Sequence, residues 1–205
     1  RSVAVGYGSL QTQNFTTATN TFNVAVGFDA GAAVTTGIKN VIVGGLALDA
    51  ATTGQENTAI GHQALTADTK GNRSVAVGQG TLVTQNFTTS TSVYNTAVGY
   101  SAGNSITTGQ QNTLIGALSG DALTDADDNT ALGYLALTAD TLGSKSTAIG
   151  DRALKTQNFT TATDTYNTAV GFQAGEFVST GASLTLIGGL AGDALTVGTN
   201  NTAVG

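Results

Sequence analysis

The five residues NTAVG at positions 95–99 decide the fold of this chain, because close variants of them recur along its whole length. The motif reads Asn or Ser, Thr or Val, a small or aliphatic residue, an aliphatic residue and Gly, and it occurs twelve times. The motif glycines are Gly6, Gly27, Gly44, Gly61, Gly78, Gly99, Gly116, Gly133, Gly150, Gly171, Gly188 and Gly205. Their spacing runs 21, 17, 17 and 17 residues and then repeats, which defines a superrepeat of 72 residues.

Side chains within the motif alternate in size, as expected for a β-strand. The residues three and one before each glycine are β-branched or aliphatic, and alanine separates them in nine motifs. Ile42, Leu114 and Leu186 are the exceptions. We expect the larger residues to face an aliphatic core and the alanines to face a close contact. Stacked strands closed by glycine turns predict an all-β parallel β-solenoid of twelve rungs, a rod about 55 Å long.

Other columns of the alignment predict how each rung is closed. A small residue followed by Leu or Gly begins three residues after each motif glycine, as in Ala47-Leu48, and suggests a second short strand. A second glycine, such as Gly54, marks a second turn ten residues after the motif glycine. We expect the Asn side chains at the first motif position to hydrogen-bond from rung to rung. Leu184 interrupts that Asn column and predicts a weaker turn.

Composition agrees with a single repeat array rather than an ordinary globular domain. The 205 residues include 28 Gly, 37 Thr and no Pro, Cys, Met or Trp, and only 10% are charged. Lack of Cys excludes disulfides and thiolate metal sites, and the net charge of −6 argues against a nucleic-acid surface. No apolar run approaches the roughly 20 residues that span a bilayer. We interpret 1–205 as one array with superrepeats 1–72, 73–144 and 145–205 (incomplete), cut from a longer fibre.

Three segments carry a family resemblance: NTAIGHQAL at 57–65, RSVAVGQGT at 73–81 and NTAVGYSAG at 95–103. They resemble the head repeats of trimeric autotransporter adhesins, and similar arrays occur in bacteriophage tail-fibre proteins. The resemblance covers the whole chain but departs from the adhesin heads in the 17-residue spacing and the regular 21-residue rung. It implies a left-handed parallel β-roll in which three chains pack around a threefold axis. The candidate inter-chain packing residues are then Ala4, Ala25, Ala59, Ala76, Ala97, Ala131, Ala148, Ala169 and Ala203.

Residues suited to catalysis or metal binding are few, and we expect no enzyme activity, catalytic residue, metal site or cofactor. The single histidine, His62, occupies a position that holds Tyr or Phe in other rungs, which favours a surface role. Asp49, Asp121 and Asp193 recur every 72 residues, too far apart to share a calcium ion, and we expect them to stabilise turns. The acidic segment DADDN at 125–129 could hold a weak ion, although a solvated loop is the preferred interpretation.

Ice binding is a further alternative, because threonine-rich solenoids can present flat hydroxyl arrays. Two observations weigh against it. The TTG pairs at 35–37, 52–54 and 107–109 fall in turns, and the strand column of Thr also accepts Val3 and Val75. We interpret a column that accepts valine as part of the core.

The 21-residue rung carries an invariant segment, TQNFTT, at 12–17, 84–89 and 156–161. Its four extra residues predict a bulge, and each copy contains two aromatics: Phe15 with Phe22, Phe87 with Tyr94, and Phe159 with Tyr166. These aromatics could fold back onto the rod, form a ledge for a glycan or receptor, or reflect a recent duplication. The segment also contains an Asn-x-Thr glycosylation sequon. Candidate surface-contact or glycosylation residues are Asn14, Phe15, Asn86, Phe87, Asn158 and Phe159.

A basic residue opens each superrepeat, at Arg1, Arg73 and Lys145, and we interpret this weak stripe as solubilising. The preferred hypothesis is a non-enzymatic, extracellular, homotrimeric fibre of a phage virion or a bacterial surface, which serves attachment. The expected partners are further copies of the chain and a cell-surface glycan or receptor, with neither nucleic acid binding nor membrane insertion by this segment.

Overall fold

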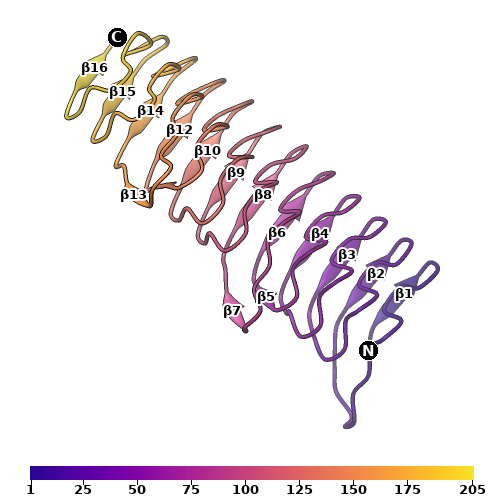
Figure 1. Cartoon of the computed structure of the whole chain (residues 1–205). Helices are drawn as coiled ribbons and strands as arrows, with labels where there is room; N and C mark the ends of the chain where they lie inside the picture. The colour runs from indigo at the N-terminus through magenta and orange to yellow at the C-terminus, as the bar shows by residue number, and fades with distance from the viewer.

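The computed structural model describes all residues 1–205 and shows an all-β parallel solenoid of about twelve turns (Figure 1). It contains no helix, and therefore none long and apolar enough to cross a membrane. The strands are β1 (Val3–Val5), β2 (Val24–Val26), β3 (Val41–Val43), β4 (Thr58–Ile60), β5 (Gly71–Asn72), β6 (Val75–Val77), β7 (Thr91–Ser92), β8 (Thr96–Val98), β9 (Thr113–Ile115), β10 (Thr130–Leu132), β11 (Gly143–Ser144), β12 (Thr147–Ile149), β13 (Thr163–Asp164), β14 (Thr168–Val170), β15 (Thr185–Ile187) and β16 (Thr202–Val204).

The twelve motif strands form one continuous parallel sheet in the order β1-β2-β3-β4-β6-β8-β9-β10-β12-β14-β15-β16. Motif residues pair with the same motif position of the next rung, so that Val24 pairs with Val41 and Val41 with Thr58. The termini lie at opposite ends of the rod (Figure 1). This register places every motif position in a straight column along the rod.

The motif glycines are required by both conformation and space. Gly99 has φ +136°, and a Cβ added to it would lie 2.6 Å from the carbonyl oxygen of Gly116 in the next rung. Side chains cannot tolerate that approach, and residues other than glycine rarely adopt such a φ. The glycine column therefore lets successive turns stack at strand spacing.

The predicted assignment of motif residues to the inward and outward faces was wrong, because the structure shows the reverse. The alanine column lies in the core of the single chain, with Ala25, Ala59, Ala76, Ala97, Ala131, Ala148 and Ala169 all 0% exposed. Only Ala4 and Ala203, in the two terminal rungs, retain exposure. The β-branched and aliphatic neighbours face outward, as Val41 (38% exposed) and Leu132 (44%) illustrate. The alanines named as candidate inter-chain contacts therefore pack within one chain.

Alanine is needed in the core because the coil is narrow and leucine enters it from the other side. Leu48 and Leu65, four residues after their motif glycines, are fully buried in the same cluster as the alanines. Five rungs have Gly at the leucine position instead: Gly31, Gly103, Gly120, Gly175 and Gly192. A Cβ on Gly31 or Gly103 would lie 2.7 Å from the side chain of Ile42 or Leu114. The larger motif residues thus fill the space that a missing leucine leaves.

The predicted second short strand is not formed. The segment that begins three residues after each motif glycine is a turn, and its leucines adopt left-handed backbone angles, for example φ 46° at Leu48 and φ 54° at Leu65. A strand cannot contain such angles. The turn still joins the rungs, because the Leu48 amide donates to the Ala64 carbonyl at 2.9 Å.

Candidate functional site

The candidate functional features of this solenoid are the outer face of the sheet, the surface of the long rung and a buried polar network. The outer face is defined here as the positions three and one before each motif glycine. None of these positions carries a charge, and the second of them is always Val, Ile or Leu. At the first position, Thr occupies seven consecutive rungs: Thr96, Thr113, Thr130, Thr147, Thr168, Thr185 and Thr202. The outer face is therefore a flat, neutral, partly apolar strip along the whole sheet.

The Asn column joins the rungs mainly through bonds between side-chain amides and backbone groups, and Asn112 also donates to the side-chain oxygen of Asn95 at 3.4 Å. The Asn112 side chain donates to the carbonyl of Ala126 at 2.8 Å, and its oxygen accepts the backbone N–H of Asn129 at 3.0 Å. Asn40 and Asn57 repeat both contacts with their own neighbours. Each amide thus connects the second turn of its own rung with the motif of the next rung. Leu184, which lacks such an amide, is buried and still donates its N–H to Asn167.

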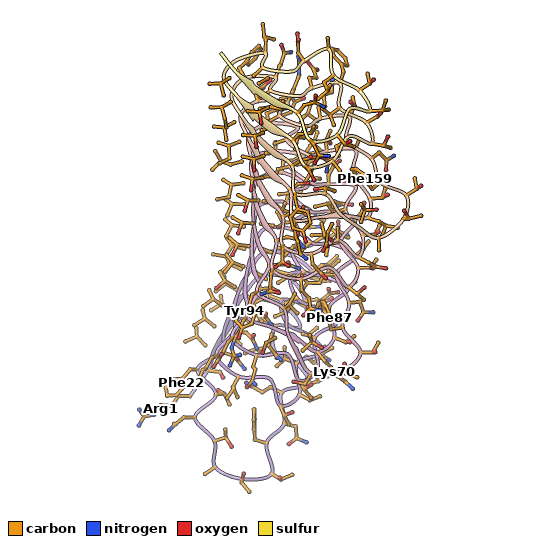
Figure 2. All side chains as sticks on the ribbon, turned by 90° about the vertical axis from the view of Figure 1, so that its left-hand side faces the viewer. Arg1, Phe22, Lys70, Phe87, Tyr94 and Phe159 are labelled. Carbon is orange, nitrogen blue, oxygen red and sulfur yellow. The ribbon has the colours of Figure 1, made fainter.

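The long rung extends from the rod as a loop, and its two-residue strands β7 and β13 pair with β5 and β11 (Figure 1). Its first aromatic residue folds inward: Phe87 and Phe159 are 6% and 8% exposed (Figure 2). The equivalent Phe15, in the first rung, is half-buried. This burial supports packing on the rod and argues against phenylalanine as the ledge for a partner.

The sequon asparagines stay on the surface of the long rung. Asn14, Asn86 and Asn158 are exposed. The side-chain oxygens of Asn86 and Asn158 accept hydrogen bonds from Thr69 and Thr141, at 3.0 and 3.2 Å. Glycosylation at these residues stays a prediction.

A buried polar network is built around the Gln of TQNFTT, and sequence reasoning missed it. Gln85 is 0% exposed and donates through Nε2 to the carboxylate of Asp68 at 2.6 Å and to Ser74 at 3.1 Å. Its oxygen accepts from Asn95 at 2.9 Å. Asp68 also accepts the backbone N–H groups of Gly71 and Phe87. Burial raises the pKa of Asp68, and these hydrogen bonds oppose the rise.

The same network recurs one superrepeat later around Gln157, which bonds Asp140, Ser146 and Asn167. In the first superrepeat, the Nε2 of Gln13 is buried without a partner. In the two later copies the carboxylate partner of the Gln, Asp68 or Asp140, lies 17 residues earlier, in the preceding rung. The network therefore depends on the rung before the long rung.

The basic residues that open the superrepeats make local contacts on the surface. The Arg73 guanidinium bonds Glu56 at 2.9 Å and lies 5.6 Å from the centre of the Tyr94 ring. Lys145 bonds Asp164 and lies 5.4 Å from the Tyr166 ring. These bonds lower the pKa of Glu56 and of Asp164 and raise that of Arg73 and of Lys145.

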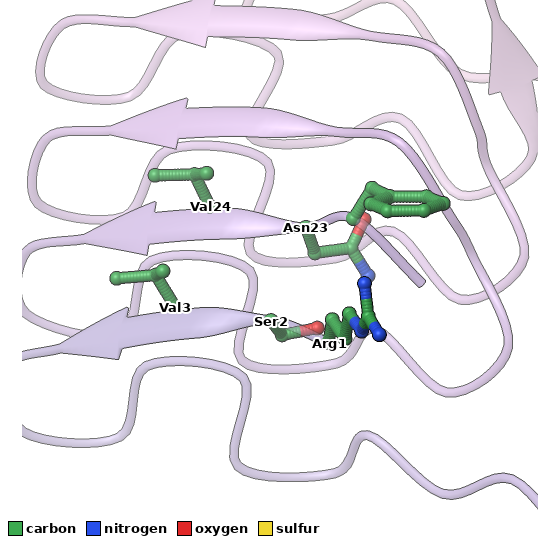
Figure 3. Close-up of a pocket in the computed structure, with 6 residues that line it drawn as sticks. Arg1, Ser2, Val3, Asn23 and Val24 are labelled. Atoms are coloured by element: carbon green, nitrogen blue, oxygen red, sulfur yellow. The ribbon is translucent and has the colours of Figure 1, made fainter. Parts of the chain in front are cut away.

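A pocket of about 390 Å³ lies on the first rung, lined by Arg1, Ser2, Val3, Phe22, Asn23 and Val24 (Figure 3). One superrepeat later the preceding rung occupies the equivalent space, and its Glu56 binds Arg73. The pocket is therefore the stacking surface of a rung, and it does not define a ligand site.

Most of the acidic residues considered as metal ligands accept hydrogen bonds between rungs. Asp49 accepts from Thr66 at 2.5 Å, and Asp121 accepts from Thr138. In the DADDN segment, Asp125 accepts from Thr107 and Thr108, which lowers its pKa. No group of three or more His, Cys, Asp or Glu residues is arranged to hold a metal ion. His62 lies on the surface, as its position among aromatic residues suggested.

Comparison of the chain with protein-family models, with curated proteins and with solved structures finds no match.

Proposed function

We propose that this chain is a non-enzymatic structural segment of an extracellular fibre, of the kind found in phage tail fibres and bacterial surface adhesins. In this proposal three copies of a left-handed roll, with 17- and 21-residue rungs, pack in parallel around a threefold axis and serve attachment. The carrying observation is the outer face, an uncharged strip that runs the full length of a twelve-stranded sheet.

The side chains of the outer face suit a packed interface. Val, Ile and Thr have few χ1 rotamers, so little side-chain entropy is lost when they are buried. Contiguous exposed apolar patches of several hundred Å² are uncommon on monomers and mark sites of association. In a parallel trimer, equal columns would meet at equal heights, because the register repeats at every rung.

Sedimentation velocity and light scattering test the proposal directly. We expect the chain to sediment as a trimer, and Ile115→Lys with Val98→Lys to dissociate it while far-UV circular dichroism stays that of a β-protein. Thr53→Lys, on the exposed second turn, is the matched control and should leave the trimer intact. A monomeric wild-type chain would contradict the proposal.

Ice binding is the second candidate, and one observation favours it. The strand column of Thr and Val, which the sequence pattern predicted as core, lies on the outer face. Outward Thr and aliphatic side chains in straight columns at strand spacing can order water into a lattice-like layer. Thermal hysteresis measured on the monomeric and trimeric forms separates the candidates, because trimer formation would bury this face. Hysteresis from a monomer would support ice binding and count against the fibre.

A further inference from the structure

The residues that directly follow the motif glycines form a second column, and its aromatic members alternate along the rod. Aromatic rings occur at every second rung, in Phe28, His62, Tyr100, Tyr134 and Phe172. The rungs between them carry Gly45, Gln79, Ala117, Asp151 and Gly189. Tyr7, in the first rung, is the one ring outside this alternation, and it stacks on Phe28 at 5.6 Å. We call the five alternating residues the aromatic row.

Hydrogen bonds hold the aromatic row in register. The carbonyl of Phe28 accepts the N–H of Leu46 in the next rung at 2.9 Å, and the carbonyl of Tyr100 accepts that of Leu118 at 2.9 Å. Phe172 makes the same bond with Leu190 at 2.8 Å. Because the ladder continues through this column, rings on alternate rungs are separated by about 9.6 Å along the axis, twice the strand spacing.

The rings are exposed, and the residues between them are mostly small. Phe28, Tyr100, Tyr134 and Phe172 are 56%, 56%, 47% and 55% exposed. A Cβ on Gly45 would lie 3.5 Å from Cδ2 of His62, which shows that the His62 ring reaches towards the intervening rung. The row therefore presents aromatic surface at regular intervals beside the outer face.

Hydrogen-bonding side chains accompany the rings. The residue after the ring is polar on four of the five rungs: Asp29, Gln63, Ser101 and Gln173. On the intervening rungs the same position holds Leu46, Gly80, Leu118, Arg152 and Leu190. The residue after the ring is thus polar on four of the five ring-bearing rungs, whereas Leu or Gly holds this position on four of the five intervening rungs.

We propose that the aromatic row binds an extended β-1,4-linked polysaccharide that runs along the rod. A pyranose ring has an apolar C–H face that stacks on an aromatic ring, and its equatorial hydroxyls need donors and acceptors at the rim. The two-sugar repeat of such a chain is close to the height of two rungs, so each ring meets an equivalent sugar. Contacts that are weak singly add up along a linear ligand. This binding site goes beyond the proposed fibre role and does not depend on it.

Pull-down with chitin and cellulose powders, together with titration of the soluble hexasaccharides, tests the proposal. We expect the wild-type chain to bind one of these polymers, and Tyr100→Ala/Tyr134→Ala/Phe172→Ala to weaken binding at least about tenfold. Tyr94→Ala/Tyr166→Ala removes exposed rings outside the row and should leave binding unchanged. Circular dichroism verifies the fold of each variant.

A spacing variant separates alternation from mere aromatic content. Ala117→Tyr with Tyr134→Ala keeps the number of rings but moves one by a single rung, and we expect binding several-fold weaker than wild type. Wild-type failure to bind both polymers would overturn the proposal. Equal binding by the spacing variant, or a changed oligomeric state in the triple variant, would also overturn it. The last result would assign the row to contacts between copies.

Discussion

Short and long rungs share one core column but fill it differently. The residue seven after the motif glycine is apolar where short rungs stack, as with Val34, Ile106 and Leu123, which are fully buried. Where a short rung meets a long one, the same column holds Asp68 and then Gln85, also buried and bonded to each other. A polar pair thus replaces aliphatic packing at the one junction where the chain must leave the rod.

This difference teaches how a repeat of nearly identical rungs keeps its register. Aliphatic columns would tolerate a shift of the stacking register by one rung, since Val would then pack against Leu. A slip would separate Asp140 from Gln157 and leave both buried without partners, at a cost of about 1–3 kcal/mol for each unsatisfied group. The Asp–Gln pairs therefore fix the position of the long rung within each superrepeat.

The largest expected effect concerns a feature common to both kinds of rung. Gly116→Ala and Gly150→Ala should each destabilise the chain by about 3–5 kcal/mol, combining left-handed strain with backbone overlap. An added Cβ would lie 2.4 Å from the Gly133 oxygen in the first case and 2.2 Å from the Gly171 oxygen in the second. Urea unfolding followed by circular dichroism measures both. A much smaller loss at Gly150 would show that the long rung relieves the crowding that short rungs cannot.

The next effect tests the aliphatic packing of short rungs. Leu114→Ala should cost about 2–5 kcal/mol, because it opens a cavity against Gly103 and Gly120. Gly103→Leu should restore part of that loss in the double variant, which then has the Ala and Leu combination of the other rungs on the Gly103 side, while Gly120 stays unfilled. Gly103 has φ 58°, and Leu65 adopts φ 54° at the same position. A double variant no more stable than Leu114→Ala would refute the complementary packing.

A smaller effect should distinguish the two kinds of junction. Asp140→Ala removes the acceptor of the Gly143 and Phe159 amides and of the Gln157 side chain, and should cost about 2–4 kcal/mol. Asn112→Ala, at a junction of short rungs, should cost about 1–2 kcal/mol, because fewer buried groups lose partners. Unfolding midpoints of the two variants decide the order. Equal losses would mean that the long-rung network adds nothing specific.

Sequence alone predicted the repeat, the parallel solenoid and the turn glycines, because the regular spacing of the motif and its glycines can be counted directly in the sequence. It could not say which face of the strand points inward. Period-two alternation defines two faces, and the choice depends on coil width, which is set by the left-handed turns at residues such as Leu48. One signal in the sequence did indicate the inward face. Where the motif alanine is replaced by Ile42 or Leu114, the leucine position eleven residues earlier is Gly31 or Gly103. Such compensation occurs between residues that share a core.

The buried network was also hidden, since Gln85 and Asp68 look like ordinary loop residues. Their burial follows only from the column they share with Val34 and Ile106. Alignment by distance from the motif glycine would have placed two polar residues in an apolar column. The network accounts for the glutamine of TQNFTT.

The smallest effect concerns pH, and it has opposite signs at two carboxylates. Burial raises the folded-state pKa of Asp68, so the folded chain holds its proton more tightly than the unfolded chain, whose pKa is about 3.9. This contribution is complete below about pH 4 and is lost as pH rises through the folded pKa. Wild type should therefore lose stability relative to Asp68→Asn as pH rises from 4. Asp164 is the matched control, because its bond to Lys145 lowers its pKa. The stability of wild type relative to Asp164→Asn should therefore increase as pH rises towards about 4. Urea unfolding from pH 3 to 7 measures both differences, and a pH-independent difference for Asp68→Asn would show that its carboxylate is ionised as readily in the folded chain as in the unfolded one.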